Sequence, residues 1–495
     1  MRRILLLICV IAHGVCAKTY AQENNNAIFK IAGNVEYNPS ADTSSLIRNP
    51  CCGWGVYDDA AGEVADASQY WLAQDSSARK YASFFYVRWR WSDMEPEEGK
   101  YAWKEDENYK KLIKGALDRG LKLAFRIYNN ARDNLRQSTP DFVRAAGAKG
   151  YTVQGGGAKY WTPYIDDPIF QEKLTNFVKA FAAEYDNPDI VDFVDGVNVG
   201  RWGECHGLEI ENMTKAKSDA ALEKITNIYG ENFKRVILIM PVNSQFGQDS
   251  EMSIAVGKNG YGFRRDGLGS QWFSRAEKSV VKTLYPSTLL IGESCYWMGN
   301  DSDSLWFDDN LYHFKTWREI YDQTYKDAID YHFNTLDLRT PIETKRWTAK
   351  TSDLVQKFIE KGGYRLYPSK VSIPKIVKQN QTFVVGHKWR NLSNGICPND
   401  NPRWNGKYKV AFALLDENAN VKQIIVDEKS NPAKFLQGID VSYTKSVTLN
   451  NLAVGKYTFA IAIVDTTKAN MPGLKLSTAD QTINGWTSIG TITII

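Results

Sequence analysis

The chain has 495 residues, of which 43% are hydrophobic and 13% aromatic, so it is long enough for two or three folded domains. Its formal net charge is +4, and three of these charges belong to Arg2, Arg3 and Lys18 at the N-terminus. Without them the chain is nearly neutral, and its charge therefore gives no indication of binding to nucleic acid or to anionic lipid.

The first residues have the pattern of a secretory signal peptide. Arg2 and Arg3 precede a short apolar run, and the small residue Ala21 closes the segment. The run is too short for a stable membrane anchor, and no later segment is long and apolar enough to cross a membrane. Lipid attachment at Cys16 is the less favoured alternative, because the residues before it make a poor lipobox. We expect a leader at residues 1–21 and export to the periplasm, the cell surface or the extracellular space.

Five cysteines follow the leader: Cys51, Cys52, Cys205, Cys295 and Cys397. An odd, sparse set in an exported chain of this length does not indicate a disulfide scaffold, and a ring closed by the adjacent Cys51 and Cys52 would be strained. No spacing of Cys and His matches a structural zinc site. The sequence therefore implies no metal and no cofactor.

Strand patterns alternate with helical patterns through most of the chain. The strand patterns lie at 53–57, 83–91, 121–128, 191–199, 236–242, 262–268, 289–293 and 334–338. Helical patterns lie between or after them, for example at 109–119, 168–185, 215–229, 270–283 and 351–361. Eight strands interleaved with helices predict a parallel (β/α)8 barrel, a TIM barrel of the α/β class, over residues 22–365, with a lead-in strand at 28–37.

A long insert rich in Gly and Tyr lies at residues 147–166, between the third and fourth predicted strands. Loops of this length are usually functional or disordered. The aromatic side chains of Tyr160, Trp161 and Tyr164 favour a wall of a binding cleft over disorder.

The pattern changes near residue 366, where helical periodicity ends. Short alternating runs follow at 382–388, 408–415, 421–426, 446–449, 455–464 and 489–495. Strands without helices predict an antiparallel β-sandwich at residues 366–495. We favour a structural support over a carbohydrate-binding module, because Trp389, Trp404 and Trp486 show no pattern that separates binding from core.

The densest group of polar side chains lies within residues 192–207, after the apolar fourth strand. It consists of Asn198, Arg201, Trp202, Glu204 and His206, with glycines between them. In a (β/α)8 barrel the chemistry lies at the C-terminal ends of the strands. The alternative is a strand end that caps the next helix, but a cap needs a single Asp or Ser. We therefore expect an active-site rim here.

A second carboxylate, Glu293, closes the apolar seventh strand. Such a glutamate is costly to bury unless it is paired or functional, and the structural alternative is an arginine partner shared with a helix. Cleavage of a glycosidic bond requires two carboxyl groups that flank the anomeric carbon. Glu204 and Glu293, each at the end of a barrel strand, fit that requirement.

Residues 88–103 read RWRWSDMEPEEGKYAW. They resemble the second-strand signature W-S-x-x-E-P-x-x-G-x-Y-x-W of the retaining barrel glycoside hydrolases, the β-galactosidase/cellulase superfamily. A narrower resemblance rests on Asn49-Pro50 with Gly53-Trp54, the motif Gly-x-Trp-Gly-Glu-x-His at 200–206, GFRRD at 262–266, Gly292-Glu293 and the C-terminal sandwich. Together these are similar to a family of secreted barrel proteins of polysaccharide-degrading bacteria that is named as a domain of unknown function.

The resemblance implies that Glu204 is the general acid/base and Glu293 the nucleophile of a retaining hydrolase, with carboxyl groups about 5–5.5 Å apart. One departure matters. In the superfamily the acid/base Glu directly follows an Asn, whereas Asn198 here lies six residues before Glu204. Asp195 and Asp266 are therefore rival acids.

The resemblance also implies substrate-binding side chains. Arg88 and Arg126 would keep Glu293 charged and bind sugar hydroxyls, and His206 would tune the acid or contact the sugar. The full set is Arg88, Trp91, Arg126, Asn198, Trp202, His206, Asp266 and Trp297. Three alternatives remain open: the tryptophans belong to the core, His206 is structural, and Asp266 pairs with a preceding arginine.

These features predict a secreted, retaining glycoside hydrolase that acts on a polysaccharide or oligosaccharide. The alternative is a non-catalytic glycan-binding protein on a degenerate barrel, which differs in whether both glutamates point into one cleft. A third reading is a barrel hydrolase that acts on another kind of bond.

Overall fold

The computed structural model describes residues 31–58, 64–130, 136–155, 158–242, 245–295 and 309–495. The predicted leader at 1–21 lies outside these ranges. The chain divides into two units. The barrel unit comprises Ser44–Tyr364 and Ser393–Asn405, and the sheet unit takes up the rest of the described chain.

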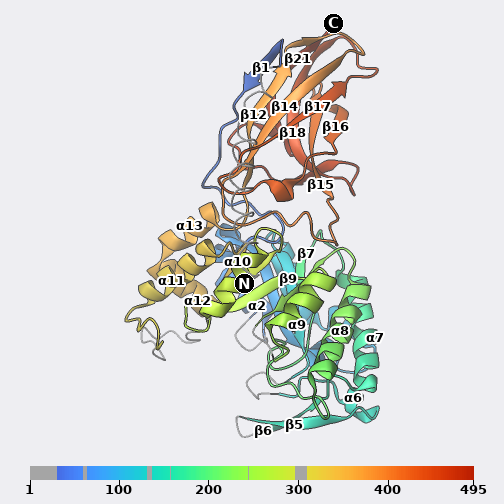
Figure 1. The fold of residues 1–495 in the computed structure, drawn as a ribbon, viewed down its shortest axis with the longest axis vertical. Coiled ribbons are helices and arrows are strands. Elements are labelled where there is room, and N and C mark those ends of the chain that lie inside the picture. The colour runs from blue at the N-terminus through green and yellow to red at the C-terminus, as the bar shows by residue number, and fades with distance from the viewer. Residues whose placement is uncertain (1–30, 59–63, 131–135, 156–157, 243–244, 296–308) are drawn as a thin grey trace, which may run out of the picture. The chain divides into compact units, whose positions relative to one another are not determined.

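Eight parallel strands close the barrel in the described part of the chain (Figure 1). They are β2 (Gly53–Tyr57), β3 (Ala82–Arg90), β4 (Lys122–Tyr128), β7 (Val191–Asp195), β8 (Ile237–Pro241), β9 (Gly262–Leu268), β10 (Leu290–Ser294) and β11 (Thr335–Arg339). The eight predicted strands and the (β/α)8 fold are thus confirmed. The largest difference is at β7, which ends at Asp195 and not at residue 199.

Helices follow the strands in the order that a barrel requires. The longer ones are α2 (Ala67–Lys80), α5 (Glu107–Leu117), α7 (Pro168–Tyr185), α8 (Lys215–Asn232), α10 (Arg275–Leu284), α11 (Trp317–Asp330), α12 (Pro341–Lys350) and α13 (Ser352–Lys361). Short helices lie at α3 (Trp91–Met94), α4 (Ala102–Glu105), α6 (Asp141–Ala145) and α9 (Gln248–Ser250), and α9 continues into the π-helix η1 (Glu251–Lys258). Capping side chains fix several starts, as where the hydroxyl of Ser274 and the carboxylate of Glu277 form a capping box at α10.

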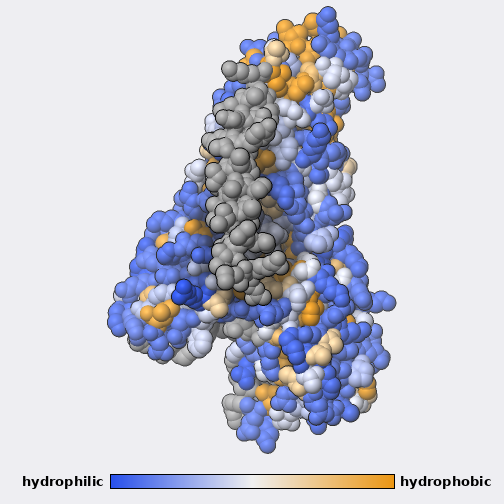
Figure 2. Space-filling model, viewed as in Figure 1, coloured by the Kyte–Doolittle hydropathy of each residue, from blue (hydrophilic) through white to orange (hydrophobic). Residues whose placement is uncertain are grey.

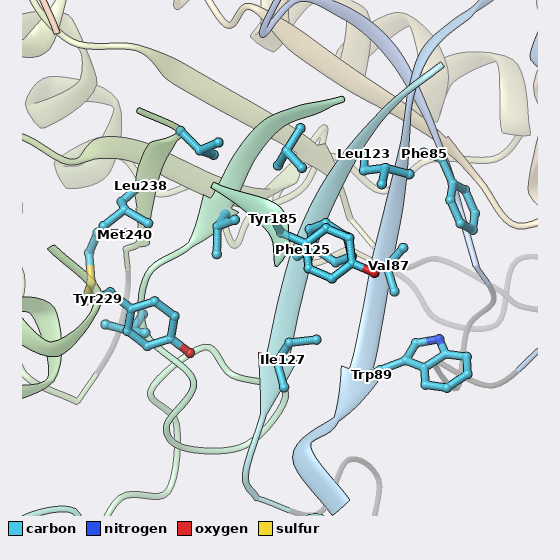
Figure 3. Packing of buried hydrophobic residues seen from close by; sticks show 14 of the residues in the cluster. Phe85, Val87, Trp89, Leu123, Phe125, Ile127, Tyr185, Tyr229, Leu238 and Met240 are labelled. Atoms are coloured by element: carbon cyan, nitrogen blue, oxygen red, sulfur yellow. The ribbon is translucent and has the colours of Figure 1, made fainter. Parts of the chain in front are cut away.

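The alternation of side chains along each strand separates the core from the barrel interior. Figure 3 shows Phe85, Val87 and Trp89 on β3, with Phe125 on β4 packed near Tyr185 of α7. These residues fill the layer between strands and helices, where burial of apolar surface stabilises the fold. The intervening residues of β3 face the interior, which turns from aromatic to charged toward the strands' C-terminal ends.

The sheet unit holds two sheets. One has the order β1 (Asn34–Tyr37), β12 (Leu366–Pro374), β14 (Thr382–Asn391) and β17 (Val441–Thr448), and all its pairs are antiparallel. The other has the order β13 (Ile376–Val377), β21 (Trp486–Ile494), β18 (Gly455–Asp465), β15 (Tyr408–Leu415) and β16 (Val421–Asp427), with β19 (Met471–Leu474) on β18 and β20 (Thr482–Ile483) on β21. His387 of β14 contacts Phe412 of β15 with ring centroids 5.2 Å apart, so the sheets pack as the predicted sandwich.

Two segments belong to a different unit from the one that the sequence predicted for them. Strand β1, within the predicted lead-in strand, pairs with β12 of the sheet unit, because the edge of β12 offers it backbone partners. Residues 393–405 follow β14 but belong to the barrel unit. There Asn394 bonds to the carbonyl of Ile329, and Arg403 bonds to that of Phe233.

The face in Figure 2 is largely hydrophilic, and hydrophobic surface gathers near the C-terminal end of the sheet unit. Exposed apolar residues of this unit include Ile376, Val454 and Ile495. Within the described ranges, no helix combines the length and apolar character that crossing a membrane requires.

Candidate active site

Charged side chains of the barrel gather at the C-terminal ends of its strands. Arg88 of β3 and Arg126 of β4 are partners in the strand register, and both follow aromatic or small interior residues. Asp195 ends β7, and Arg264 and Glu293 lie on β9 and β10. A cluster of this kind at this end of a barrel is where catalytic groups are found in enzymes of this fold.

Glu293 is the centre of the cluster, and only 4% of its side chain is exposed. Among the described residues, four arginines make ion pairs with its carboxylate. The distances are 3.5 Å to Nη1 of Arg88, 3.6 Å to Nη2 of Arg126 and 3.1 Å to Nη2 of Arg339, and Arg264 makes the fourth pair. All four come from strands, and Arg339 also pairs with Glu343 of α12 at 3.5 Å, so the arginine partner shared with a helix that was considered from sequence is observed. Positive charge on several sides offsets the cost of burying this carboxylate.

Asp195 is a second fully buried carboxylate at the same end. It accepts hydrogen bonds from Tyr86 Oη and Arg126 Nε, both at 2.8 Å, and Arg264 Nε lies 3.5 Å away. Burial by itself would lower the pKa of Arg126, but Tyr86, Glu204 and Asp195 outweigh it and raise that pKa well above its ordinary value. Arg126 is therefore a permanent cation between carboxylates. Asp195 is enclosed by these partners and is a poor rival to Glu204 as an acid.

Glu204 lies on a tight loop after β7 and pairs with Nη1 of Arg126. Its second oxygen is 3.9 Å from Nε2 of His206. Two glycines allow the loop to fold this tightly, and both have positive φ. A Cβ at Gly200 would lie 2.6 Å from Cys205 Cα, and one at Gly203 would lie 3.2 Å from Arg126 Cγ. The loop therefore presses directly on the arginine that its own glutamate binds.

Trp202 and Cys205 on the same loop also have positive φ, 61° and 60°. Residues other than glycine rarely adopt a positive φ. Those that do are found preferentially at functional sites, where the surrounding structure fixes the backbone. Trp202 is half-buried and meets His206 edge to face, with ring centroids 5.9 Å apart.

A small recess, open to solvent, lies beside Glu204. Its lining consists of Glu204, His206, Pro241, Val242, Arg264 and Asp266. The structure thus brings together three residues predicted from the sequence, Glu204, His206 and Asp266. Glu293 is not among the described lining residues, but Arg264 both lines the recess and pairs with Glu293.

Asp266 binds the guanidinium of Arg265, which also donates to Glu277 at 2.9 Å. Burial by itself would raise the pKa of Asp266, but the charges of Arg265, Arg264 and Arg126 outweigh it and hold that pKa below its ordinary value. Asp266 is therefore a carboxylate at the recess. This pairing is the structural alternative considered from sequence, although the side chain still reaches the recess.

Two predicted substrate-binding residues lie in the core instead. Trp91 is fully buried, donates from Nε1 to Glu95 at 2.8 Å and packs on Phe177, so the prediction of a stacking surface is wrong. Asn198 is also fully buried, and its carbonyl accepts a bond from the Asn129 amide at 2.9 Å. No surface of either residue is open to a sugar. Trp297 lies outside the described residues.

The insert at 147–166 contains a hairpin of β5 (Gly150–Gly155) and β6 (Ala158–Pro163). Tyr151 Oη donates to the carbonyl of Gly207 at 2.9 Å and accepts from the amide of Glu209 at 3.2 Å. The hairpin therefore contacts the segment that directly follows the loop of Glu204.

Sequence reasoning missed Arg264 and Arg339 as site residues. On β9 the alternation of side chains puts Arg264 and Asp266 on one face and Arg265 on the other, so the GFRRD motif contained the signal. On β11, Asp337 and Arg339 alternate with Leu336 and Leu338 in the same way. Arg339 donates to Asp337 at 2.9 Å, which orients it toward Glu293.

The cluster can supply two carboxylates at the recess, Glu204 and Asp266, and a third, Glu293, that lies among arginines. Arginine is protonated at any ordinary pH, so these charges do not depend on a titrating partner. In the described ranges, no three His, Cys, Asp or Glu side chains come together as a metal site would require. All five described cysteines are buried, and no disulfide bond joins any two of them.

No protein-family model and no curated protein matches the chain. Solved structures with a similar fold include a GH30 endoxylanase from Clostridium papyrosolvens C71, with 13% identity over 84% of this chain and 97% of that one and a TM-score of 0.37. Endo-glycoceramidase II from a Rhodococcus species shows 12% identity over 84% and 100%, with a TM-score of 0.41. The exo-β-1,4-mannosidase Op5Man5 from Opitutaceae bacterium strain TAV5 shows 12% over 64% and 58%, with a TM-score of 0.39. These are likenesses of fold at low identity, and no residue role is carried over from them.

Proposed function

We propose that the protein is a secreted, retaining glycoside hydrolase that cleaves a polysaccharide or oligosaccharide with Glu204 and Glu293. One observation carries the proposal: Glu204, on the loop after the fourth barrel strand, and Glu293, on the seventh strand, both contact the guanidinium of Arg126. Two carboxyl groups opposed across a short distance are what glycoside hydrolysis requires.

The two glutamates differ in exposure and in the number of arginines that contact them. Glu204 lines the recess, and 13% of its side chain is exposed, so it can reach a glycosidic oxygen as general acid and later activate water as general base. Glu293 is surrounded by arginines that favour its charged form, as a nucleophile needs. A sugar ring in the recess would meet Arg264, which pairs with Glu293.

In the first step Glu204 protonates the leaving oxygen while Glu293 attacks the anomeric carbon. In the second step Glu204 takes a proton from water, which displaces Glu293 from the sugar. In this mechanism Arg126 stays in contact with both side chains.

The test is an assay of released reducing sugar on a panel of polysaccharides and oligosaccharides, with Glu204→Gln and Glu293→Gln. We expect each substitution to lower kcat about 10²- to 10⁴-fold, because each removes a proton-transfer or nucleophilic group. Glu97→Gln is the control, because Glu97 is exposed and its ion pair with Lys100 lies on the surface. Full activity of both variants would contradict the assignment.

Azide separates the two roles. With Glu204→Ala, azide should restore activity and give a glycosyl azide of retained configuration, because it attacks the sugar–Glu293 intermediate. With Glu293→Ala, it should give the inverted configuration, because azide then replaces the missing nucleophile. The opposite pattern would exchange the two roles.

A non-catalytic glycan-binding protein is the second candidate, and the enclosure of Glu293 favours it. With 4% of its side chain exposed and four arginine partners among the described residues, Glu293 resembles the centre of a structural network. In that case the wild type would bind a glycan of the panel without cleaving it, and Glu204→Gln would change only the binding.

A further inference from the structure

Trp272 is the one aromatic residue whose side chain is exposed in the described part of the chain, with 57% of its surface accessible. It lies between β9 and α10, past the C-terminal end of a barrel strand. Tryptophan is on average highly buried, because exposure of its large ring to water is unfavourable. A large exposed apolar side chain at the functional end of a barrel indicates a binding surface.

The backbone that carries this indole is firmly held. The Trp272 amide donates to Ser270 Oγ at 3.1 Å, and that hydroxyl donates to the Gly267 carbonyl at 2.8 Å. The neighbouring amide of Gln271 donates to Asp309 at 2.7 Å. A ring on a fixed backbone loses little conformational entropy on binding, which is the general advantage of a preorganised site.

One arginine links this ring to the recess. The guanidinium of Arg265 donates to the carbonyl of Trp272 and also binds Asp266, which lines the recess beside Glu204. A Cβ at Gly267 would lie 3.1 Å from Trp272 Cβ, so the indole leaves the backbone beside the residue that follows Asp266. The backbone that carries the exposed ring is therefore linked through Arg265 to Asp266, a residue of the recess.

We propose that Trp272 is the stacking surface for a second pyranose ring of the substrate whose first ring occupies the recess. This inference rests on the proposed function and extends it to a chain of at least two sugars. The apolar C–H face of a pyranose matches a flat indole, and the sugar hydroxyls around its rim stay in water. Asp266, which lines the recess and pairs with Arg265, can accept hydrogen bonds from sugar hydroxyls.

The first experiment compares Trp272→Ala and Trp272→Phe with wild type on a disaccharide and on the methyl glycoside of the same sugar. The methyl glycoside has one ring and fills only the recess. We expect Trp272→Ala to lower kcat/KM for the disaccharide about tenfold, in line with a stacking contact, and to leave the methyl glycoside unchanged. Trp272→Phe, which keeps a flat ring, should retain most of the activity.

Leu72→Ala is the matched control, because Leu72 on α2 is 74% exposed and its truncation also removes an apolar surface side chain. It should leave both substrates unchanged. Equal losses on both substrates with Trp272→Ala, or no loss at all, would overturn the inference. The unfolding midpoints of the variants show that any loss is not a loss of fold.

Affinity electrophoresis separates this inference from the proposed catalysis. The Glu204→Gln chain, with and without Trp272→Ala, is run through gels that contain xylan, mannan or β-glucan. Retardation that Trp272→Ala abolishes supports the stacking surface even if the wild type cleaves nothing, in which case only the hydrolase proposal fails. Equal retardation of both chains, or none in any gel, would overturn it.

Discussion

Arg126 joins the parts of the site through a single side chain. Within the described structure its guanidinium contacts the carboxylates of Asp195, Glu204 and Glu293. Arginine suits this position because its planar group presents five donors in fixed directions and stays charged when buried. A lysine would offer one point charge and could not hold three carboxylates in a defined arrangement.

Glu343 on α12 gives a prediction at the residue scale. Burial, and then the charge of Asp337, raise the pKa of Glu343 to about 7, although Arg339 acts in the opposite direction. The ordinary pKa of a glutamate is 4.5. At a pH between 4.5 and about 7, Glu343 is therefore protonated in the folded chain and ionised in the unfolded chain. The free energy of unfolding should therefore fall by about 3 kcal/mol as the pH rises from about 4.5 to 7.

Glu343→Gln should remove this contribution, because Gln stays neutral in both states. Urea unfolding at pH 5 and pH 8 measures it, and the difference between the two pH values should be smaller for the variant than for wild type by about 3 kcal/mol. Glu107→Gln is the control, since Glu107 is exposed. An unchanged pH dependence in Glu343→Gln would contradict the raised pKa.

The loop after β7 is the element on which the site depends. Gly203 and Gly207 both have positive φ, at 69° and 61°, but their surroundings differ. A Cβ at Gly203 would meet Arg126 Cγ at 3.2 Å and Tyr128 Cβ at 3.1 Å, whereas one at Gly207 would meet no atom within 4 Å. The two glycines therefore share backbone strain, and only Gly203 has a steric requirement.

Gly207→Ala should cost about 1 kcal/mol in the free energy of unfolding, from the strained φ alone. Gly203→Ala should cost more and should also lower kcat/KM at least tenfold, because the new methyl group displaces Arg126 and the Glu204 that it holds. Denaturant unfolding and the hydrolysis assay measure the two effects. Equal losses of activity in the two variants would show that strain, and not contact with Arg126, determines the position of Glu204.

The two units are assembled from interleaved segments of the chain. Residues 393–405 return to the barrel unit after β14, and Arg403 bonds there to the carbonyls of Phe233, Asn259 and Gly260. Its guanidinium also lies 5.3 Å from the ring of Tyr261. This segment thus donates hydrogen bonds to backbone carbonyls of the barrel's loops. The barrel unit therefore includes residues that lie beyond the predicted domain boundary near residue 366.

At the scale of the whole molecule, Arg403→Ala should destabilise the barrel unit by about 2–3 kcal/mol, since it removes several partly buried hydrogen bonds. Hydrogen exchange should then become faster in residues 229–241 and 259–268, and exchange in β15 and β18 of the sheet unit should not change. Arg390→Ala is the control, because Arg390 makes an exposed pair with Asp440 in the sheet unit. Faster exchange in both units would mean that they unfold together.

Local patterns were sufficient to predict the strands of the barrel. Short apolar runs such as residues 236–242 can be buried only as strands covered on both faces, and their alternation with helices leads to a parallel barrel. Glu293 lies on β10, where the apolar strand pattern placed it, whereas Glu204 lies on the loop after β7, because that strand already ends at Asp195. His206 and Asp266 line the recess beside Glu204, and their roles in binding a sugar stay predictions.

Which side chains are buried, and which partners they contact, could be learned only from the tertiary structure. Trp91 and Trp272 are both tryptophans after a strand end, yet one is fully buried and the other is 57% exposed, because helices and loops distant in sequence cover the first alone. The arginines around Glu293 come from four strands spread over residues 88–339, and no local pattern relates them. The sequence by itself determined the order of strands and helices and the strand ends that carry the charged residues. Only the closure of the barrel decided which charges meet, because it brings strands distant in sequence to within hydrogen-bonding distance.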